Sequence, residues 1–281
     1  MRQIAGALPL LLILSTTLLS QEIVKGRTAL ISFAKIPENA VIVFRDKKLP
    51  LLQNPLQKEK TFVLVPVPYR SKPGDATLLI RYHGGEKRVP LRISDGSYAS
   101  ETIRVAPAKV KPNPKQKKRT QAEYAEAMKL YNTFTPVRYW HSPFIVPMHS
   151  PVTSPFGTAR LYNGSLRSFH SGTDFKAAPG TPVTAANDGV VVLAKNRYYA
   201  GNSVILDHGE GLYTCYYHLS EIDVKTGQKV TKGQRLGLSG ATGRVTGPHL
   251  HFAAMLYGIQ VDPLQLIGQI NSLFKTSALD N

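Results

Sequence analysis

The chain has 281 residues, of which 42% are hydrophobic. It contains one cysteine, so an intramolecular disulfide and a cysteine-based zinc knuckle are excluded. Its length exceeds the ~100 to 200 residues usual for one domain, so we expect two domains. The net charge of +17 is uneven, because residues 1–150 hold 24 Lys and Arg against 10 Asp and Glu, whereas residues 151–281 hold 11 against 8.

Residues 1–20 have the pattern of a signal peptide. Met1 and Arg2 give a positive start, an apolar run follows at 4–19, and a cleavage region precedes Gln21. The run is too short, and too soon followed by charge, for a membrane span. We therefore expect an exported protein of the periplasm, cell envelope or extracellular space, with no transmembrane span after signal removal.

Residues 21–105 predict an accessory domain built as an antiparallel β-sandwich, with the immunoglobulin type as one candidate. Short apolar or alternating runs occur at 28–33, 40–44, 61–65 and 76–82, and Pro, Gly, Asn and Asp separate them. His83 precedes two glycines in a predicted hairpin, so it needs no chemical role.

Residues 106–144 predict a basic linker followed by one helix at 121–132. The stretch 109–119 is rich in lysine and contains proline, as exposed linkers often do. Such charge suits an anionic wall polymer, an anionic lipid surface or nucleic acid. We exclude nucleic acid, because the protein is exported and the stretch lacks interleaved aromatic residues. A solvated linker without a partner remains the alternative.

The C-terminal half is also predicted to be mostly β. Segments 179–193 and 226–237 repeat a turn, strand, glycine turn and strand, which resembles the biotinyl- and lipoyl-type hybrid sandwiches. A carrier or binding module would follow, but no lysine-centred motif accompanies the repeat. A further strand is expected at 213–218, where alternation places His218 with Thr214 and Tyr216, opposite Cys215 and its neighbours.

Histidines and an aspartate in two short phrases predict a metal site. In His249-Leu-His251 the two rings must share one face of a strand, while Leu250 faces the core. His170 and Asp174 are four positions apart, an even spacing that places both on one face of an extended segment. The glycine between them permits close backbone approach. Imidazole and carboxylate are the ligands that hold zinc while leaving a position for water, so the pattern favours a hydrolase.

The phrases TSPFG (153–157), HSGTD (170–174), YHLS (217–220), GATG (240–243) and GPHLH (247–251) together resemble the lysostaphin-type (LytM-like) zinc endopeptidases of peptidoglycan. The resemblance covers residues 145–267, implies a LytM-like peptidase domain there and leaves 268–281 as a tail. It implies one Zn²⁺ per chain, with a zinc-bound water as the nucleophile in hydrolysis of peptide cross-links or bridges.

The resemblance also implies a role for each residue of the site. The zinc ligands would be His170, Asp174 and His251, and the catalytic residues lining the site would be His218 and His249. Degenerate family members that lack ligands act as catalytically silent wall-binding or hydrolase-activating modules. All five residues are present here, which argues against that alternative.

Several questions stay open in the sequence. The scissile bond is either D-alanyl to diamino acid or Gly-Gly, and either His218 or His249 is the base. Tyr198 and Tyr199 either border a substrate groove or pack in the core. The basic N-terminal half either docks on anionic wall or, through the helix and residues 134–148, covers the groove.

We expect structural roles for four other histidines: His83, His141, His149 and His208.

Overall fold

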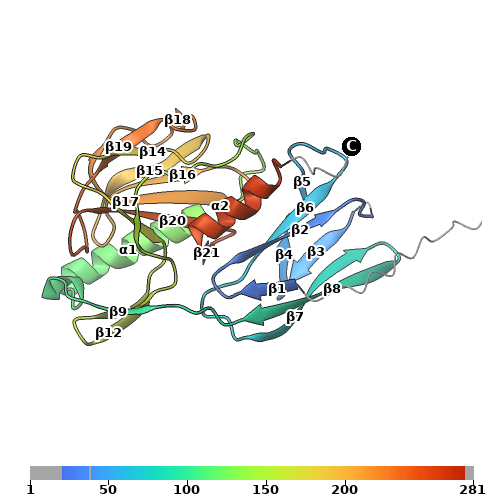
Figure 1. Cartoon of the computed structure of the whole chain (residues 1–281), viewed down its shortest axis with the longest axis horizontal. Coiled ribbons are helices and arrows are strands. Elements are labelled where there is room, and N and C mark those ends of the chain that lie inside the picture. The colour runs from blue at the N-terminus through green and yellow to red at the C-terminus, as the bar shows by residue number, and fades with distance from the viewer. Residues whose placement is uncertain (1–20, 38, 276–281) are drawn as a thin grey trace, which may run out of the picture.

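The computed structural model describes residues 21–37 and 39–275, and it is mostly β, with two strand-built units side by side (Figure 1). The predicted signal peptide lies outside the described residues. In the part of the chain that is described, no helix is both long enough and apolar enough to cross a membrane.

The N-terminal unit is a two-sheet sandwich, as predicted. One sheet has the order β1-β8-β7-β3-β4 and the other the order β2-β6-β5. The strands are β1 (Gln21–Val24), β2 (Thr28–Phe33), β3 (Val41–Phe44), β4 (Lys47–Leu49), β5 (Leu52–Gln53), β6 (Thr61–Pro66), β7 (Gly74–Tyr82) and β8 (Gly85–Ser94). Their inward residues form one core, in which Val63, Val65 and Leu78 are fully buried. The pairing is not wholly antiparallel, because β1 lies parallel to β8.

The C-terminal unit is built on a ten-stranded sheet with the central order β10-β13-β20-β17-β16-β15-β18. Its strands are β10 (Val152–Ser154), β13 (Thr173–Lys176), β14 (Pro182–Thr184), β15 (Gly189–Arg197), β16 (Gly201–Asp207), β17 (Leu212–Ile222), β18 (Lys229–Val230), β19 (Arg235–Ser239), β20 (His249–Leu256) and β21 (Ile259–Val261). The repeated segments pair crosswise, β14 with β19 and β15 with β18, which agrees with the duplication seen in the sequence.

A small separate sheet joins the segment between the two units to the C-terminal unit. The hairpin of β11 (Ala159–Tyr162) and β12 (Leu166–Phe169) pairs through β11 with β9 (Ser100–Ile103), which runs parallel to it. This three-stranded sheet therefore attaches residues 100–103 to the part of the chain that carries the site.

Helix α1 (Pro114–Tyr131) begins seven residues earlier than the sequence predicted. Asn113 caps it, with reciprocal bonds between its side chain and the Gln116 backbone and between the Gln116 side chain and the Asn113 backbone. Proline at the first helical position suits this start, because the N–H it lacks would have no partner there. The second half of the predicted basic linker is thus helical, and its residues Lys115, Lys117 and Lys118 are exposed.

The two faces of the large sheet are covered by different parts of the chain. Ala127 and Tyr131 of α1 pack against Cys215 and Met255, on the face to which His251 also belongs by alternation. Trp140 and Phe144, which are 1% and 4% exposed, pack with Leu250 and Phe252 on the opposite face. Trp140, Phe144 and Met148 thus anchor the segment 134–148 in the core beneath the sheet, and no residue of this segment lines the groove beside the site.

Helix α2 (Pro263–Ser272) closes the core and continues past residue 267, where the sequence placed the end of the peptidase domain. Asp262 caps it, and the buried face includes Leu266 and Ile270. The Gln265 side chain bonds both backbone groups of Thr28, which links the two units.

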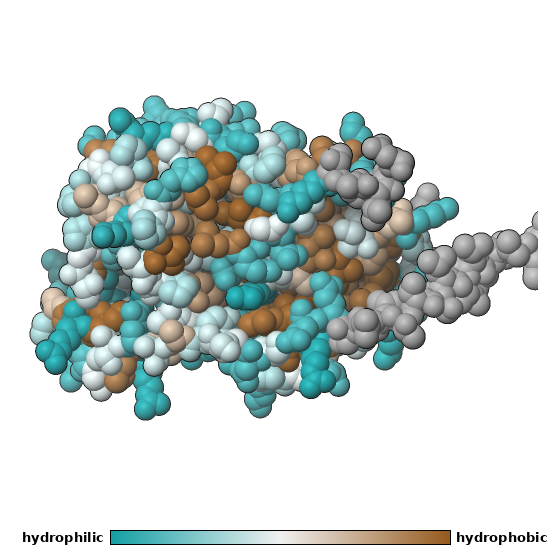
Figure 2. All heavy atoms as spheres, viewed as in Figure 1, coloured by the Kyte–Doolittle hydropathy of each residue, from teal (hydrophilic) through white to brown (hydrophobic). Residues whose placement is uncertain are grey.

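On the surface seen in Figure 2, apolar residues lie in separate areas among polar ones.

Candidate metal centre

Strand β20 sets two histidines on one side of the sheet. Leu250 and Phe252 are fully buried in the core, so His249 and His251 face the other way, as the alternation predicted. Antiparallel pairing of β13 with β20 puts Asp174 directly opposite His251. A cross-strand pair of this kind brings the two side chains into contact.

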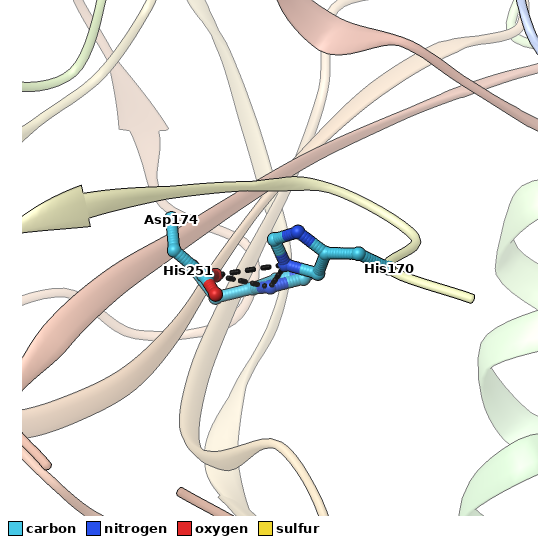
Figure 3. Close-up of side chains that lie close together, drawn as sticks. All are labelled: His170, Asp174 and His251. Atoms are coloured by element: carbon cyan, nitrogen blue, oxygen red, sulfur yellow. Dashed lines mark hydrogen bonds and ion pairs between the residues drawn. The ribbon is translucent and has the colours of Figure 1, made fainter. Parts of the chain in front are cut away.

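Three ligand atoms meet at this point (Figure 3). His170 Nε2, Asp174 Oδ1 and His251 Nδ1 lie 2.9 Å from one another in each of the three pairings. The residues are 1%, 6% and 7% exposed. Gly172 makes this approach feasible, since a Cβ there would lie 2.6 Å from His251 Nε2 and 2.5 Å from the Phe252 carbonyl oxygen.

Hydrogen bonds behind His170 fix the orientation of its ring. Nδ1 lies 3.0 Å from the Pro155 carbonyl oxygen and 3.2 Å from Ser154 Oγ. A carbonyl only accepts, so Nδ1 donates its proton there, and in the neutral ring the Nε2 lone pair points at the cluster. Such outer hydrogen bonds are typical of histidines that bind metal.

The charge states suit a cation. Although burial favours the protonated acid, hydrogen bonds from the rings of His170 and His251, when these rings carry a proton on the facing nitrogen, lower the pKa of the Asp174 carboxyl below its ordinary value. Burial lowers the pKa of His251 to about 4, against the opposing effect of Asp174. At neutral pH the centre therefore offers a carboxylate and a neutral imidazole.

The donor set fits a metal ion better than it fits a proton. One proton can bridge only two of the three converging atoms, whereas a cation attracts all three lone pairs. Among residues 21–37 and 39–275, this is the one cluster of three or more His, Cys, Asp or Glu with metal-binding geometry. Two nitrogens and one carboxylate oxygen form the kind of set that holds a catalytic metal with a position left open.

The face assigned to His218 by alternation was wrong, because β17 contains a bulge. Tyr216 pairs with Val204 and Leu219 with Asn202, so two residues of β17 oppose one of β16. His218 has a φ of +65°, a left-handed conformation that non-glycine residues rarely adopt. Its ring therefore lines the groove beside Tyr217, whereas Tyr216 stays in the core. Bulges often redirect a side chain at a functional site.

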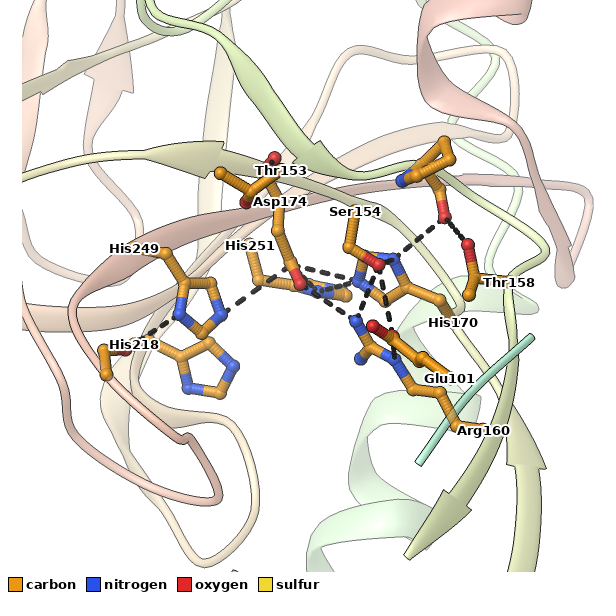
Figure 4. Close-up of polar contacts among 12 residues, drawn as sticks. Glu101, Thr153, Ser154, Thr158, Arg160, His170, Asp174, His218, His249 and His251 are labelled. Carbon is orange, nitrogen blue, oxygen red and sulfur yellow. Dashed lines mark hydrogen bonds and ion pairs between the residues drawn. The ribbon is translucent and has the colours of Figure 1, made fainter. Parts of the chain in front are cut away.

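His218 and His249 flank the cluster (Figure 4), with His218 lining the groove and His249 Nε2 facing Asp174. His218 Nδ1 lies 2.8 Å from the Thr242 carbonyl oxygen, and His249 Nδ1 lies 2.9 Å from that of Gly247. Each Nδ1 therefore donates to the backbone, which leaves Nε2 for chemistry. His249 Nε2 is 3.6 Å from Asp174 Oδ1, and the rings of His218 and His249 are 4.8 Å apart between centroids. Burial, followed by the charges of His251 and His249, holds the pKa of His218 well below its ordinary value.

On the other side of the cluster, Arg160 holds the second oxygen of Asp174 (Figure 4). Its Nη2 donates to Asp174 Oδ2 at 2.9 Å, and its Nε donates to Glu101 Oε1 at 2.6 Å. Arg160 belongs to β11 and Glu101 to β9, so the interdomain strand supports the centre. Neither residue is predictable from the sequence, since only the pairing of β9 with β11 brings them together.

Replacing Arg160 with methionine is expected to weaken metal binding by ~10–100-fold, the range found when outer-sphere partners are removed. Lysine at 160 should recover little, because it lacks the fork that contacts two carboxylates. Metal affinity is measured by competition with a chromophoric chelator, alongside the melting temperature. Arg167→Met, in the exposed part of the same hairpin, is the matched control. Equal affinities for the Arg160 variants and the wild type would contradict the role of Arg160.

A cavity of about 250 Å³ adjoins the centre, with His170, His251, Tyr199 and Tyr217 among its lining residues. Tyr199 therefore borders the groove, whereas Tyr198 is buried. The Tyr217 ring stacks on His251 at 5.5 Å between centroids, and its hydroxyl bonds Tyr131 of α1 at 2.9 Å.

His208 is structural, as predicted. It is fully buried, its Nδ1 donates to the Asp188 carbonyl oxygen at 2.6 Å, and its Nε2 lies 2.7 Å from Thr214 Oγ1. His83 lies in the turn between β7 and β8, on the other unit.

Comparison with known proteins gives one consistent result. Residues 168–263 match the model of peptidase family M23. A crystal structure of a candidate M23 peptidase from Pseudomonas aeruginosa superposes with a TM-score of 0.69 at 30% identity, covering 88% of this chain and 95% of that one.

Two curated relatives match over the C-terminal unit. The peptidoglycan DD-endopeptidase ShyA of Vibrio cholerae is 50% identical over 115 residues, which are 41% of this chain and 27% of ShyA. The DD-carboxypeptidase/endopeptidase Mpg of Neisseria meningitidis serogroup B is 37% identical over 119 residues, 42% of this chain and 27% of Mpg. The match thus spans about a quarter of the length of each relative.

Proposed function

Because this chain belongs to peptidase family M23, we propose that it is an exported zinc metalloendopeptidase that hydrolyses peptide cross-links or bridges of bacterial peptidoglycan. The convergence of His170 Nε2, Asp174 Oδ1 and His251 Nδ1 beside a groove carries the proposal. The relatives named as peptidoglycan DD-endopeptidases point to the same substrate class. A protein with that substrate works in the cell envelope.

One Zn²⁺ per chain would be held by His170, Asp174 and His251. When bound, zinc supplies a Lewis acid that polarises the scissile carbonyl and makes water nucleophilic near neutral pH. The Nε2 atoms of His218 and His249 lie beside this position. One of the two rings accepts a proton at Nε2 from the attacking water and passes it to the leaving amine, while the other ring, protonated at Nε2, donates a hydrogen bond to the developing oxyanion.

Digestion of purified sacculi, followed by mass analysis of the released peptides, tests the proposed function. The zinc-loaded protein should release stem peptides cut at cross-links, and chelator treatment should stop the release. Binding to sacculi without any cleavage would instead favour a catalytically silent wall-binding or hydrolase-activating module.

The basic N-terminal half is proposed to dock on anionic wall. A truncated protein starting near residue 145 would not test this cleanly, since it would remove Trp140 and Phe144 from the core of the C-terminal unit. Substitution of the exposed lysines at the start of α1 leaves both cores intact.

The triple change Lys115→Gln, Lys117→Gln and Lys118→Gln is expected to weaken binding to sacculi about tenfold, because each exposed charge contributes roughly 0.5 kcal/mol. Sedimentation with sacculi should show a smaller salt dependence than the wild type, since salt screens such contacts. Cleavage of a small soluble cross-linked peptide serves as the control and should not change. Wall binding that is unaltered at every salt concentration would contradict docking through α1.

A further inference from the structure

Arg244 borders the groove that contains the candidate metal centre, and the catalytic scheme above gives it no role. It lines the same cavity of about 250 Å³ as His218 and His251. Two residues before it, Thr242 accepts the hydrogen bond from His218 Nδ1. Arg244 is therefore close to the reacting groups without belonging to them.

The backbone around Arg244 is held in place by two contacts. Its N–H donates to the Tyr199 carbonyl oxygen at 2.8 Å. Gly243 has a φ of +89°, and a Cβ there would lie 2.5 Å from the Gly201 nitrogen. Only glycine fits such a close approach of two backbones. The loop that carries Arg244 is thus fixed against the turn before β16.

Two tyrosine rings hold the side chain. The Arg244 Cζ lies 4.4 Å from the ring centroid of Tyr162 and 4.5 Å from that of Tyr199. Contacts of this type attract the cation and restrict its rotation. A guanidinium fixed in this way loses less conformational entropy when it binds a ligand.

The polar edge of the Arg244 guanidinium has no partner within residues 21–37 and 39–275, where neither an ion pair nor a side-chain hydrogen bond of Arg244 is found. The other arginine of the groove differs, because Arg160 already contacts Glu101 and Asp174. Lys109 adds positive charge nearby, and its pKa is lowered first by burial and then by the charges of Arg119 and Arg244. The rim is thus a fixed cationic site open to the groove.

We propose that Arg244 is a specificity-determining residue that binds a free carboxylate of the peptide substrate, on the carbon attached to the scissile nitrogen. The inference rests on the proposed peptidase function. A planar guanidinium edge matches a carboxylate with two parallel hydrogen bonds. This assignment selects between the two bonds that the sequence left open.

The two candidate bonds differ in the chemistry beside the scissile amide. In a cross-link from D-alanine to a diamino acid with two carboxyl groups, the linking nitrogen sits on a carbon that bears a free carboxylate. Within a Gly-Gly bridge, no such carboxylate is present. Arg244 therefore favours the direct cross-link, and a neutral carboxamide at the same carbon should bind poorly.

Two cross-linked peptides that differ only in this group, carboxylate or carboxamide, provide the test with the full-length, zinc-loaded protein. The wild type should cleave the carboxylate peptide with a kcat/KM ~100-fold higher than the carboxamide, as expected for a charge-assisted pair. Arg244→Gln should bring this ratio close to one, and Arg244→Lys should retain part of it. Arg235→Gln, a surface variant outside the groove, should keep the full ratio. Zinc content and melting temperature are measured for every variant.

The ratio separates recognition from a structural role, since a merely structural arginine would lower stability or the rates on both peptides together. A wild-type ratio near one, or an unchanged ratio in Arg244→Gln, overturns the role of Arg244 while cleavage of both peptides leaves the peptidase function intact. Failure of the zinc-loaded wild type to cleave either peptide overturns the role of Arg244, and the release of peptides from sacculi then decides separately whether the peptidase function stands.

Discussion

Asp174→Ala is expected to abolish metal binding and hydrolysis together. Asp174 Oδ1 contacts both His170 Nε2 and His251 Nδ1 at 2.9 Å, so its loss removes the anion that holds the centre together. A bound metal contributes several kcal/mol to the transition state, so turnover should fall by at least ~1,000-fold. Elemental analysis after dialysis and release of peptides from sacculi measure the two effects.

Folding must be separated from metal loss in this experiment. Asp174→Ala leaves the largely buried Arg160 with one carboxylate fewer, which itself destabilises the chain. Asp174→Asn keeps the shape of the side chain, and Asp223→Ala removes a carboxylate from a surface pair with Arg235 in the same unit. Full zinc occupancy and full turnover in folded Asp174→Asn and Asp174→Ala proteins would show that the ligand assignment is wrong.

His218→Ala and His249→Ala are expected to keep zinc and to lose at least ~100-fold in turnover. Both rings lie outside the converging triad, and both are oriented by backbone carbonyl groups so that Nε2 can transfer a proton. Acid–base and oxyanion roles are each worth about this much. Metal analysis distinguishes these residues from ligands.

Backbone strain requires a second variant at position 218. The φ of +65° is unfavourable for alanine, whereas asparagine tolerates this conformation well. His218→Asn therefore tests the imidazole without the strain, and His83→Ala in the exposed hairpin is the control. If His249→Ala lost zinc while His251→Ala retained it, His249 would be the ligand and His251 the catalytic residue.

The alternation of β20 was predictable because nothing interrupts it. Leu250 and Phe252 need burial, and a regular strand then places His249 and His251 together on the other side. In β17 the same argument failed at His218, because an inserted residue shifts every later side chain to the other face. A bulge with a non-glycine residue at positive φ leaves little trace in one sequence.

Residues that reach the site only through tertiary contacts could not be predicted from the sequence either. Glu101 and Arg160 are 59 positions apart and meet only because β9 pairs with β11. The early start of α1 was easier to predict from the sequence, since asparagine, proline and glutamine at 113, 114 and 116 form a helix-capping pattern. The run of positive charge at 115–119 obscured that signal.

The parallel pairing of β9 with β11 means that the residues supporting the site extend beyond the segment that matches the family model. The family match begins at residue 168, after both strands, yet Glu101 and Arg160 orient a ligand inside it. A fragment cut at the limits of that match would contain all five polar groups of the site without the scaffold that aligns Asp174. A minimal enzyme engineered to keep this support of Asp174 therefore starts upstream of residue 100.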